Sequence, residues 1–341
     1  MLALRDIVGQ KPLYFGTYPD GTMAVASLMT ALTRIGIQNP QPVPPGKLVR
    51  ATISELSVLF DGSLTRPEEI AVSEEEASAR LRDLLSTSLE NEVSKDFALA
   101  FSGGLDSTLV AQAARENELR PELITIATKE DEEVKHAHEV SSSLGLDMTT
   151  RLLSHADVLD CIGDVVRTIE SCDPTIMGVS VPLYFACEVA EDMGVDCLLA
   201  GQLSDELFAG YGRFDQLAGK KNPKPVADEV WRSVLAASVN DFEPGDKLAV
   251  SHRLDLRCPF AFLPLVEYAL RLPVALKLRV VGGKVVRKYI LRRVASNWNL
   301  PTTVVNRPKR AVQYSTGVQK ILLKEAKRRK LSLGGLIESL T

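Results

Sequence analysis

The segment from Phe97 to Thr108 constrains the fold more than any other part of the chain. Five apolar residues lead directly into Ser102, Gly103 and Gly104, and a run with helical periodicity follows from Ser107. This order predicts a buried strand, a tight glycine turn and a helix. Two adjacent glycines let the backbone approach a ligand closely, and the amides of the turn would face the same point as the start of the helix.

The side chains of this turn favour a phosphate ligand. The hydroxyls of Ser102 and Ser107 would lie beside the turn amides, a combination that suits phosphate oxygens. Because the carboxylate of Asp106 would repel a bare anion, we interpret it as a ligand of Mg²⁺ that accompanies the phosphates. An ordinary strand-to-helix connection would explain a bare Gly-Gly pair equally well. The G-x-x-x-x-G-K-[ST] pattern of kinases and GTPases is absent from the sequence.

The composition is typical of a soluble globular protein. The 341 residues are enough for two domains, and 45% of them are hydrophobic and 25% charged. A net charge of −4 argues against a protein devoted to nucleic acid. No apolar run is long enough for a membrane span and no signal peptide is visible, so we expect a cytoplasmic protein with no membrane partner.

The cysteine pattern argues against zinc, iron–sulfur and disulfide frameworks. No C-x-x-C pair occurs, and we interpret the cysteines as small apolar core residues. They are Cys161, Cys172, Cys187, Cys197 and Cys258.

Apolar segments alternate with helical patterns through the middle of the chain. Strands are expected at 97–101, 123–127 and 195–200, and helices near 74–93, 107–117, 131–144, 155–170 and 180–193. This alternation predicts an α/β fold with a parallel sheet covered by helices on both faces. Ligands of such sheets bind at the carboxyl ends of the strands, where Ser102, Ala127 and Gly201 stand. Ile126 stands next to such an end, where it could pack on a ligand as well as in the core.

A second polar constellation follows the strand expected at 195–200. That strand leads into Asp205 and Glu206, and two neighbouring carboxylates repel one another unless a cation or base lies between them. Asp205 and Asp106 together would bracket a Mg²⁺–pyrophosphate unit. An N-cap and a solvated helix start explain the same residues equally well when the segment is considered alone.

These segments resemble a known family of synthetases. The string S-G-G-L-D-S at 102–107 resembles the PP-loop of the ATP pyrophosphatases, which cleave ATP between the α- and β-phosphates. The segment 200–211 is similar to S-G-E-G-[SA]-D-E-[LV]-F-G-G-Y of the asparagine synthetases, and Asp173-Pro174 resembles their E-D-P segment. The resemblance implies a PP-loop synthetase domain that binds ATP and Mg²⁺.

Three basic segments extend the resemblance towards the C-terminus. Arg253–Phe260 resembles E-x-R-x-P-F with Asp255 in place of Glu, Lys288–Arg292 resembles K-x-x-L-R, and Arg307–Gly317 resembles R-x-K followed by a distant Gly. By this resemblance Lys309, supported by Arg307, stabilises the charge that develops on the leaving pyrophosphate. Without the resemblance, a basic loop is ordinarily a solvated surface, and so is the basic helix expected at 320–330.

Two departures from the family pattern leave the acceptor open. Gln202 stands where the family has Glu, and Leu203 where it has Gly. In the family that Glu is thought to assist attack by the nitrogen nucleophile. A glutamine side chain orients a nucleophile by hydrogen bonds but accepts no proton near neutral pH.

The N-terminal segment resembles part of a glutamine-hydrolysing domain. Residues 5–14 are similar to R-D-x-x-G-x-K-P-L-Y of that domain in asparagine synthetases. The family nucleophile is an N-terminal cysteine, whereas this chain begins Met1-Leu2 and its first cysteine is Cys161. We therefore expect residues 1–65 to be a truncated glutaminase-like remnant, and residues 66–341 to be the synthetase domain. The remnant is either a structural cap on the synthetase domain or part of a longer protein that the start site truncates. Nitrogen would come from free ammonia or from a separate glutaminase.

The resemblance implies one reaction and a set of residues for it. A carboxylate, aspartate in the family, is activated by ATP as an acyl-adenylate, and ammonia then displaces AMP to give asparagine. The implied catalytic residues are Lys309, Asp205, Gln202 and Asp255, and the implied metal ligands are Asp106 and Asp205. The implied ATP contacts are Phe101, Ser102, Gly103, Gly104, Leu105, Asp106, Ser107, Ile126, Ala200, Gly201 and Arg307. Two alternatives stay open: a different carboxylate or amine acceptor, and a non-catalytic nucleotide-binding relative. A homodimer is also compatible with the sequence.

Overall fold

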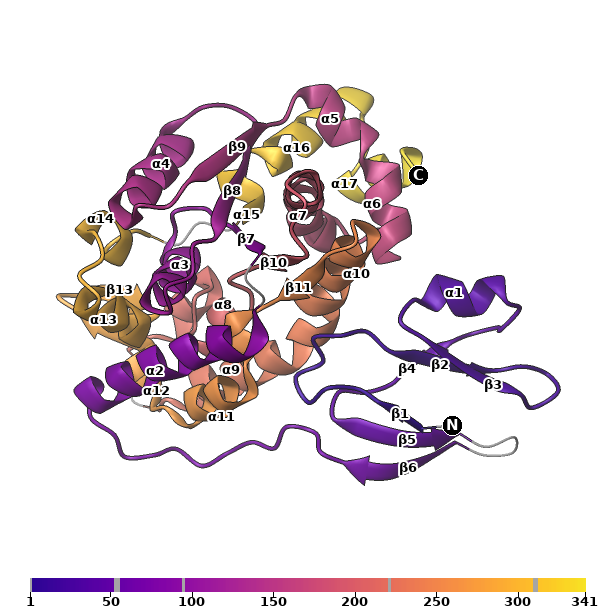
Figure 1. The fold of residues 1–341 in the computed structure, drawn as a ribbon, viewed down its shortest axis with the longest axis horizontal. Coiled ribbons are helices and arrows are strands. Elements are labelled where there is room, and N and C mark those ends of the chain that lie inside the picture. Colours follow the sequence, from indigo (N-terminus) through magenta and orange to yellow (C-terminus); the bar gives the residue numbers. More distant parts are fainter. Residues whose placement is uncertain (1, 52–55, 94–95, 220–221, 309–311) are drawn as a thin grey trace.

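A parallel β-sheet forms the centre of the molecule (Figure 1). The computed structural model describes residues 2–51, 56–93, 96–219, 222–308 and 312–341. The strand order is β11-β10-β7-β8-β9, and every neighbouring pair is parallel. The strands are β7 (Phe97–Ala100), β8 (Glu122–Ala127), β9 (Met148–Leu152), β10 (Cys197–Leu199) and β11 (Asp255–Arg257). The predicted α/β fold is confirmed.

Helices cover both faces of this sheet. In chain order, the helices up to residue 207 are α2 (Glu74–Glu92), α3 (Leu105–Glu116), α4 (Glu132–Leu144), α5 (His155–Asp160), α6 (Ile162–Ile169), α7 (Pro174–Asp192) and α8 (Ser204–Leu207). The later helices are α9 (Lys224–Ala237), α10 (Glu243–Ser251), α11 (Leu263–Arg271), α12 (Val274–Lys277), α13 (Tyr289–Asn297), α14 (Thr302–Val305), α15 (Val312–Ser315), α16 (Val318–Arg329) and α17 (Leu333–Ser339). Helices α3 and α4 lie on one side of the sheet, and α7 and α10 on the other (Figure 1).

Shorter elements join these helices. They are the 3₁₀ turns Gly212–Leu217 and Pro259–Ala261, the π-helical turn Ser238–Phe242 that leads into α10, and the hairpin of β12 (Leu278–Val281) and β13 (Lys284–Arg287).

The helix boundaries follow local capping chemistry. Ser73 and Glu76 form the predicted capping box of α2, and Gly145 ends α4 in the left-handed conformation with φ 63°. Helix α7 begins at Pro174, earlier than the predicted residue 180, because the Asp173 side chain caps its first amides. The helix predicted at 155–170 is wrong as a single element, because the chain divides at Cys161 into α5 and α6.

The N-terminal segment forms two small antiparallel sheets. One has the order β1-β5-β6 and the other β3-β2-β4. Their strands are β1 (Leu2–Leu4), β2 (Tyr14–Thr17), β3 (Met23–Ala26), β4 (Gln41–Pro42), β5 (Lys47–Ala51) and β6 (Leu56–Asp61), and α1 (Met29–Arg34) follows β3. The boundary predicted at residue 65 falls in the connection between β6 and α2. The identity of residues 1–65 as a glutaminase remnant stays a prediction.

A buried polar network fastens this segment to α10. The phenol of Tyr14 donates to Glu243 at 2.6 Å, and the ammonium of Lys247 donates to the Tyr14 oxygen at 3.0 Å. Lys247 also pairs with Glu170 at 2.6 Å. Burial, together with the hydrogen bond to Glu243, raises the pKa of Tyr14 well above its ordinary value. The N-terminal sheets are therefore held by specific polar contacts.

The cysteines are mostly core residues, as predicted, with one exception. Cys161, Cys187, Cys197 and Cys258 are buried, and burial raises the pKa of the Cys161 and Cys187 thiols to about 12. Cys172 is exposed, so the prediction is wrong for that residue. Within the described parts of the chain, every helix is too short or too polar to span a bilayer.

Candidate active site

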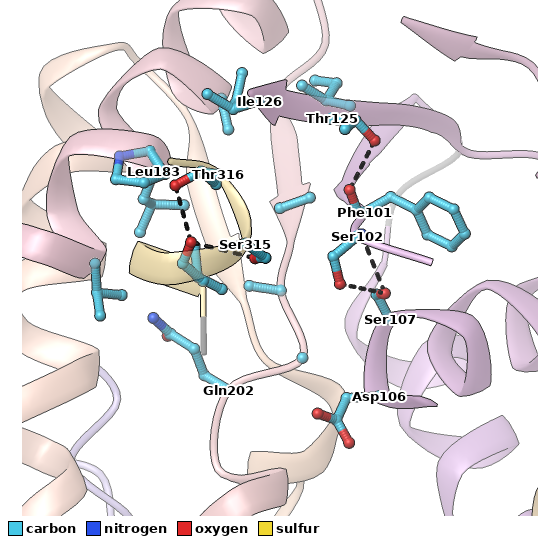
Figure 2. Close-up of a pocket in the computed structure, with 18 of the residues that line it drawn as sticks. Phe101, Ser102, Asp106, Ser107, Thr125, Ile126, Leu183, Gln202, Ser315 and Thr316 are labelled. Atoms are coloured by element: carbon cyan, nitrogen blue, oxygen red, sulfur yellow. Dashed lines mark hydrogen bonds between the residues drawn. The ribbon is translucent and has the colours of Figure 1, made fainter. Parts of the chain in front are cut away.

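A pocket opens at the carboxyl ends of β7, β8 and β10 (Figure 2). Nine of the residues expected from the sequence line it: Phe101, Ser102, Asp106, Ser107, Ile126, Ala200, Gly201, Gln202 and Asp205. They come from three strand ends that are far apart in the chain, and the parallel sheet brings them to one edge. The lining combines apolar side chains with many polar and acidic ones, as a pocket for a polar small molecule requires.

The glycine turn after β7 is held by its own serines. The amide of Gly104 donates to Ser102 Oγ at 3.3 Å. The amide of Ser102 donates to Ser107 Oγ at the same distance, and Figure 2 shows the two serines side by side. Gly104 is the N-cap of α3 and Leu105 its first residue, so α3 begins two residues before the predicted Ser107. Gly103, Gly104 and Leu105 shape this turn without lining the pocket.

Gly103 is required by both its conformation and its neighbours. Its φ is 64°, and a Cβ at this position would lie 2.9 Å from Ala137 Cα. The imidazole of His136 lies with Nε2 3.0 Å from the Gly103 carbonyl oxygen. His136 on α4, which the sequence did not single out, therefore supports the turn from behind.

A lysine lies between the two aspartates that were expected to hold a metal. The Nζ atom of Lys288 is 2.7 Å from both carboxylate oxygens of Asp106 and 2.7 Å from Asp205 Oδ1. Ser204 Oγ donates to Asp106 Oδ1, also at 2.7 Å. The cation required between the two carboxylates is thus supplied by the protein. The resemblance of Lys288–Arg292 to K-x-x-L-R was the one signal in the sequence that pointed to it.

The residues present do not fit a resident Mg²⁺. Magnesium takes oxygen ligands at about 2.0–2.1 Å in near-octahedral geometry. Here Asp106 and Asp205 converge on the ammonium of Lys288. Among the residues that the structure describes, no three His, Cys, Asp or Glu side chains gather as a metal site.

The backbone around Asp205 explains two positions of the family pattern. Leu203 adopts a φ of 73°, where a side chain costs roughly 1 kcal/mol and glycine costs nothing. The family glycine at this position therefore has a conformational reason. At Gly210 a Cβ would meet the Asp205 carboxylate, 2.8 Å from its Cγ, so only glycine leaves room for this side chain.

Glu206 is a buried pocket residue and not the solvated helix residue of the alternative interpretation. It accepts a hydrogen bond from the phenol of Tyr211, and both side chains line the pocket. Burial, and next the charge of Asp205, raises the pKa of Glu206.

Gln202 is held by hydrogen bonds at both ends of its amide. Its Nε2 donates to the carbonyl oxygen of Asp241 at 3.5 Å, and the Cys258 thiol donates to its Oε1 at 3.3 Å. Asp241 belongs to the π-helical turn before α10 and also lines the pocket. Gln202 is therefore oriented by its surroundings.

Arg307, which follows α14, is held beside the pocket. Arg307 pairs with Glu133, a lining residue, at 2.7 Å, but does not itself line the pocket. Arg292 donates to the Arg307 carbonyl at 3.1 Å and so fixes the start of the loop. Lys309 lies outside the described residues, and its role stays a prediction.

Asp255 is not brought to the pocket. It is the first residue of β11, at the end of the sheet opposite to Ala200. Its carboxylate pairs with Lys11 and Arg257, each at 2.6 Å, and Lys11 also pairs with Asp246. These contacts join the N-terminal segment to the sheet, so the geometry gives no support to a catalytic role.

Comparisons with known proteins agree with these motifs. The family model described as asparagine synthase matches residues 80–240 and 218–336. A protein of Methanocaldococcus jannaschii named as a glutamine-hydrolysing asparagine synthetase is 28% identical, covering 76% of this chain and 54% of that protein. Asparagine synthetase B of Escherichia coli is 27% identical over 92% of this chain and 58% of its own length. The chain thus spans somewhat more than half the length of these relatives.

The similarity to solved structures is lower, both in sequence identity and in superposition of the backbone. The NMN synthetase from Francisella tularensis is 12% identical with a TM-score of 0.39, covering 79% of this chain and 87% of that chain. A score at this level carries no argument about function.

Proposed function

Because the chain belongs to the asparagine synthase family, we propose that it is an AMP-forming carbon–nitrogen ligase that makes asparagine from aspartate, ammonia and ATP. The observation that carries this proposal is the convergence of Ser102, Ser107, Asp205 and Gln202 on one pocket. In this proposal the turn would bind the phosphates and Gln202 would orient the nucleophile, so that two successive half-reactions occur at one centre.

In the first half-reaction the substrate carboxylate attacks the α-phosphorus of ATP. The bond from that phosphorus to the bridging oxygen breaks, and pyrophosphate leaves with the electron pair. The amides and hydroxyls of the 102–107 turn would bind the pyrophosphate at the start of α3, and Ile126 with Phe101 would contact the adenosine. By the family resemblance, Lys309 with Arg307 would stabilise the charge on the leaving group.

In the second half-reaction ammonia attacks the acyl carbon, AMP leaves and the nitrogen loses a proton. Gln202 would orient the incoming nitrogen through its amide, which hydrogen bonds already hold in place. Mg²⁺ enters this proposal only as the ion that accompanies ATP as substrate, because the carboxylates of Asp106 and Asp205 are paired with Lys288.

We propose that ammonia, and not glutamine, is the nitrogen source for this chain, supplied from solution or by a separate glutaminase. Residues 1–65 contain no cysteine that could attack glutamine. Such an enzyme would work in the cytoplasm, where ATP is available.

The test is to incubate the protein with ATP, Mg²⁺ and aspartate, with and without ammonium, and to measure pyrophosphate, AMP and the product mass. AMP, pyrophosphate and asparagine formed together support the proposal. Asp106→Ala should abolish turnover while the circular dichroism spectrum stays that of the wild type, and retained turnover would refute the assignment of the turn. Ammonia released from glutamine by the purified chain would refute the proposed nitrogen source.

Gln202 favours one second candidate function, the same adenylation with another carboxylate or amine acceptor. AMP formation with such a pair, but not with aspartate and ammonium, would support it. Binding of ATP without pyrophosphate exchange across a panel of carboxylates would instead indicate a non-catalytic nucleotide-binding protein.

A further inference from the structure

The ammonium of Lys288 occupies the point on which the carboxylates of Asp106 and Asp205 converge. It lies 2.7 Å from three carboxylate oxygens of Asp106 and Asp205 and 3.3 Å from Ser204 Oγ. The Lys288 side chain is 3% exposed, and those of Asp106 and Asp205 are 13% and 14% exposed. All three charges therefore interact with little screening by water.

The backbone holds this lysine in place. Lys288 adopts a φ of 53°, a conformation that a non-glycine residue enters at a cost, and its amide donates to the Phe208 carbonyl at 3.2 Å. Lys288 is also the N-cap residue of α13, so its backbone belongs to the start of that helix. The absence of a side chain at Gly210 leaves space for Lys288 Cε beside Asp205. Four separate local features thus position the Lys288 ammonium between Asp106 and Asp205.

We propose that Lys288 is the resident counter-cation of Asp106 and Asp205, and that it keeps divalent metal ions out of this site in the nucleotide-free protein. Two carboxylates that face one point would otherwise attract a divalent cation, and a buried ammonium at that point repels it. A metal ion enters the pocket only together with nucleotide phosphates, which supply the negative charge that Lys288 has neutralised. This inference goes beyond the proposed function because it concerns the protein without substrates.

The experiment is a titration of the full chain with Mn²⁺, without nucleotide, that measures free Mn²⁺ by electron paramagnetic resonance. The titration is run at about pH 8, where protons in general compete little with metal ions for carboxylate oxygens. We expect wild-type protein to bind Mn²⁺ only weakly. Lys288→Met should bind one Mn²⁺ with an affinity at least about tenfold higher, because the buried positive charge between the carboxylates of Asp106 and Asp205 is gone. Lys288→Arg, which keeps the charge, should bind no better than wild type.

Controls separate this site from general metal binding. Lys320→Met, at an exposed lysine of α16, should behave as wild type. Adding Asp106→Asn to Lys288→Met should remove the gain. If Lys288→Met unfolds easily, Mn²⁺ should raise its Tm but not that of the wild type, because a ligand that binds the folded state stabilises it.

Two results would overturn the inference: tight binding of one Mn²⁺ by nucleotide-free wild-type protein, or no gain in affinity or Tm for Lys288→Met. Because no substrate is present, these results are independent of asparagine formation, and either proposal can fail alone.

Discussion

The guanidinium of Arg5 lies 2.8 Å from the carboxylate of Glu243, and both side chains are buried. The remaining donors of Arg5 bind backbone carbonyls of the N-terminal segment, including that of Val43 at 3.0 Å. Glu243 is the first residue of α10 and follows the π-helical turn that carries Asp241, a pocket residue. The N-terminal segment therefore supports one wall of the pocket through this ion pair.

Arg5→Met should destabilise the protein by roughly 3–5 kcal/mol, because it leaves the Glu243 carboxylate buried without its cation. The free energy of unfolding in urea measures this loss. The matched control is Arg66→Met, which removes the arginine of an exposed pair with Asp228 and should change stability little. Equal losses in the two variants would contradict a special role for the buried pair.

His136 should make stability fall in mildly acidic solution. Burial, and next the charge of Arg307, lowers the pKa of His136 below its ordinary value of 6.5. The unfolded chain therefore binds the proton more readily than the folded protein. The contribution of neutral His136 to the free energy of unfolding is complete above pH 6.5 and is lost as the pH falls through the pKa of His136 in the folded protein. The expected slope of unfolding free energy is at most about 1.4 kcal/mol per pH unit.

The free energy of unfolding in denaturant should be measured for wild type and His136→Gln from above pH 6.5 down into mildly acidic solution. The difference between the two proteins isolates the histidine, since the acidic groups near it, Glu133 and Glu139, are common to both. Parallel pH profiles would show that His136 does not titrate differently on folding.

The strand–turn–helix at 97–116 could be predicted from sequence because its signals are local. An apolar run, adjacent glycines and helical periodicity all fall within about twenty residues, and the parallel sheet follows from repeating this pattern. Strands β9 and β11 were not predicted. Met148–Leu152 is only half buried and Asp255–Arg257 is three residues long, so neither gives a clear apolar pattern.

The K-x-x-L-R resemblance singled out Lys288, but its contact with Asp106 and Asp205 could not be predicted, since that contact depends on packing between segments more than eighty residues apart. For Asp255, a motif in the sequence predicted a position that the structure does not show. Its motif resembles that of the family, but whether it faces the pocket or Lys11 depends on which end of β11 it occupies. The residues of the motif alone do not determine at which end of the strand Asp255 lies.

Gly210→Ala should impair catalysis by displacing Asp205 or Lys288. The added methyl group would lie 2.8 Å from Asp205 Cγ, in a region with no free space. Overpacking of this kind costs about 1–3 kcal/mol, and we expect pyrophosphate release to fall at least about tenfold. Gly212→Ala is the control, because its nearest neighbour, an Arg287 nitrogen, would be at an ordinary 3.7 Å. Full activity in Gly210→Ala would show that the present arrangement of Asp205 and Lys288 is not required.

Gln202→Glu should change the use of the nitrogen nucleophile more than the binding of ATP. The substitution removes the donor that faces the Asp241 carbonyl, so the new carboxylate should turn into the pocket, while the Cys258 thiol can still donate to it. There it can accept a proton from an attacking amine, which glutamine cannot do. We expect the KM for ammonium and its pH dependence to shift, with ATP–pyrophosphate exchange within about twofold of wild type. Gln41→Glu, at an exposed position on β4, controls for the added charge. A large rise in the KM for ATP with unchanged use of ammonium would instead assign Gln202 to the nucleotide half of the pocket.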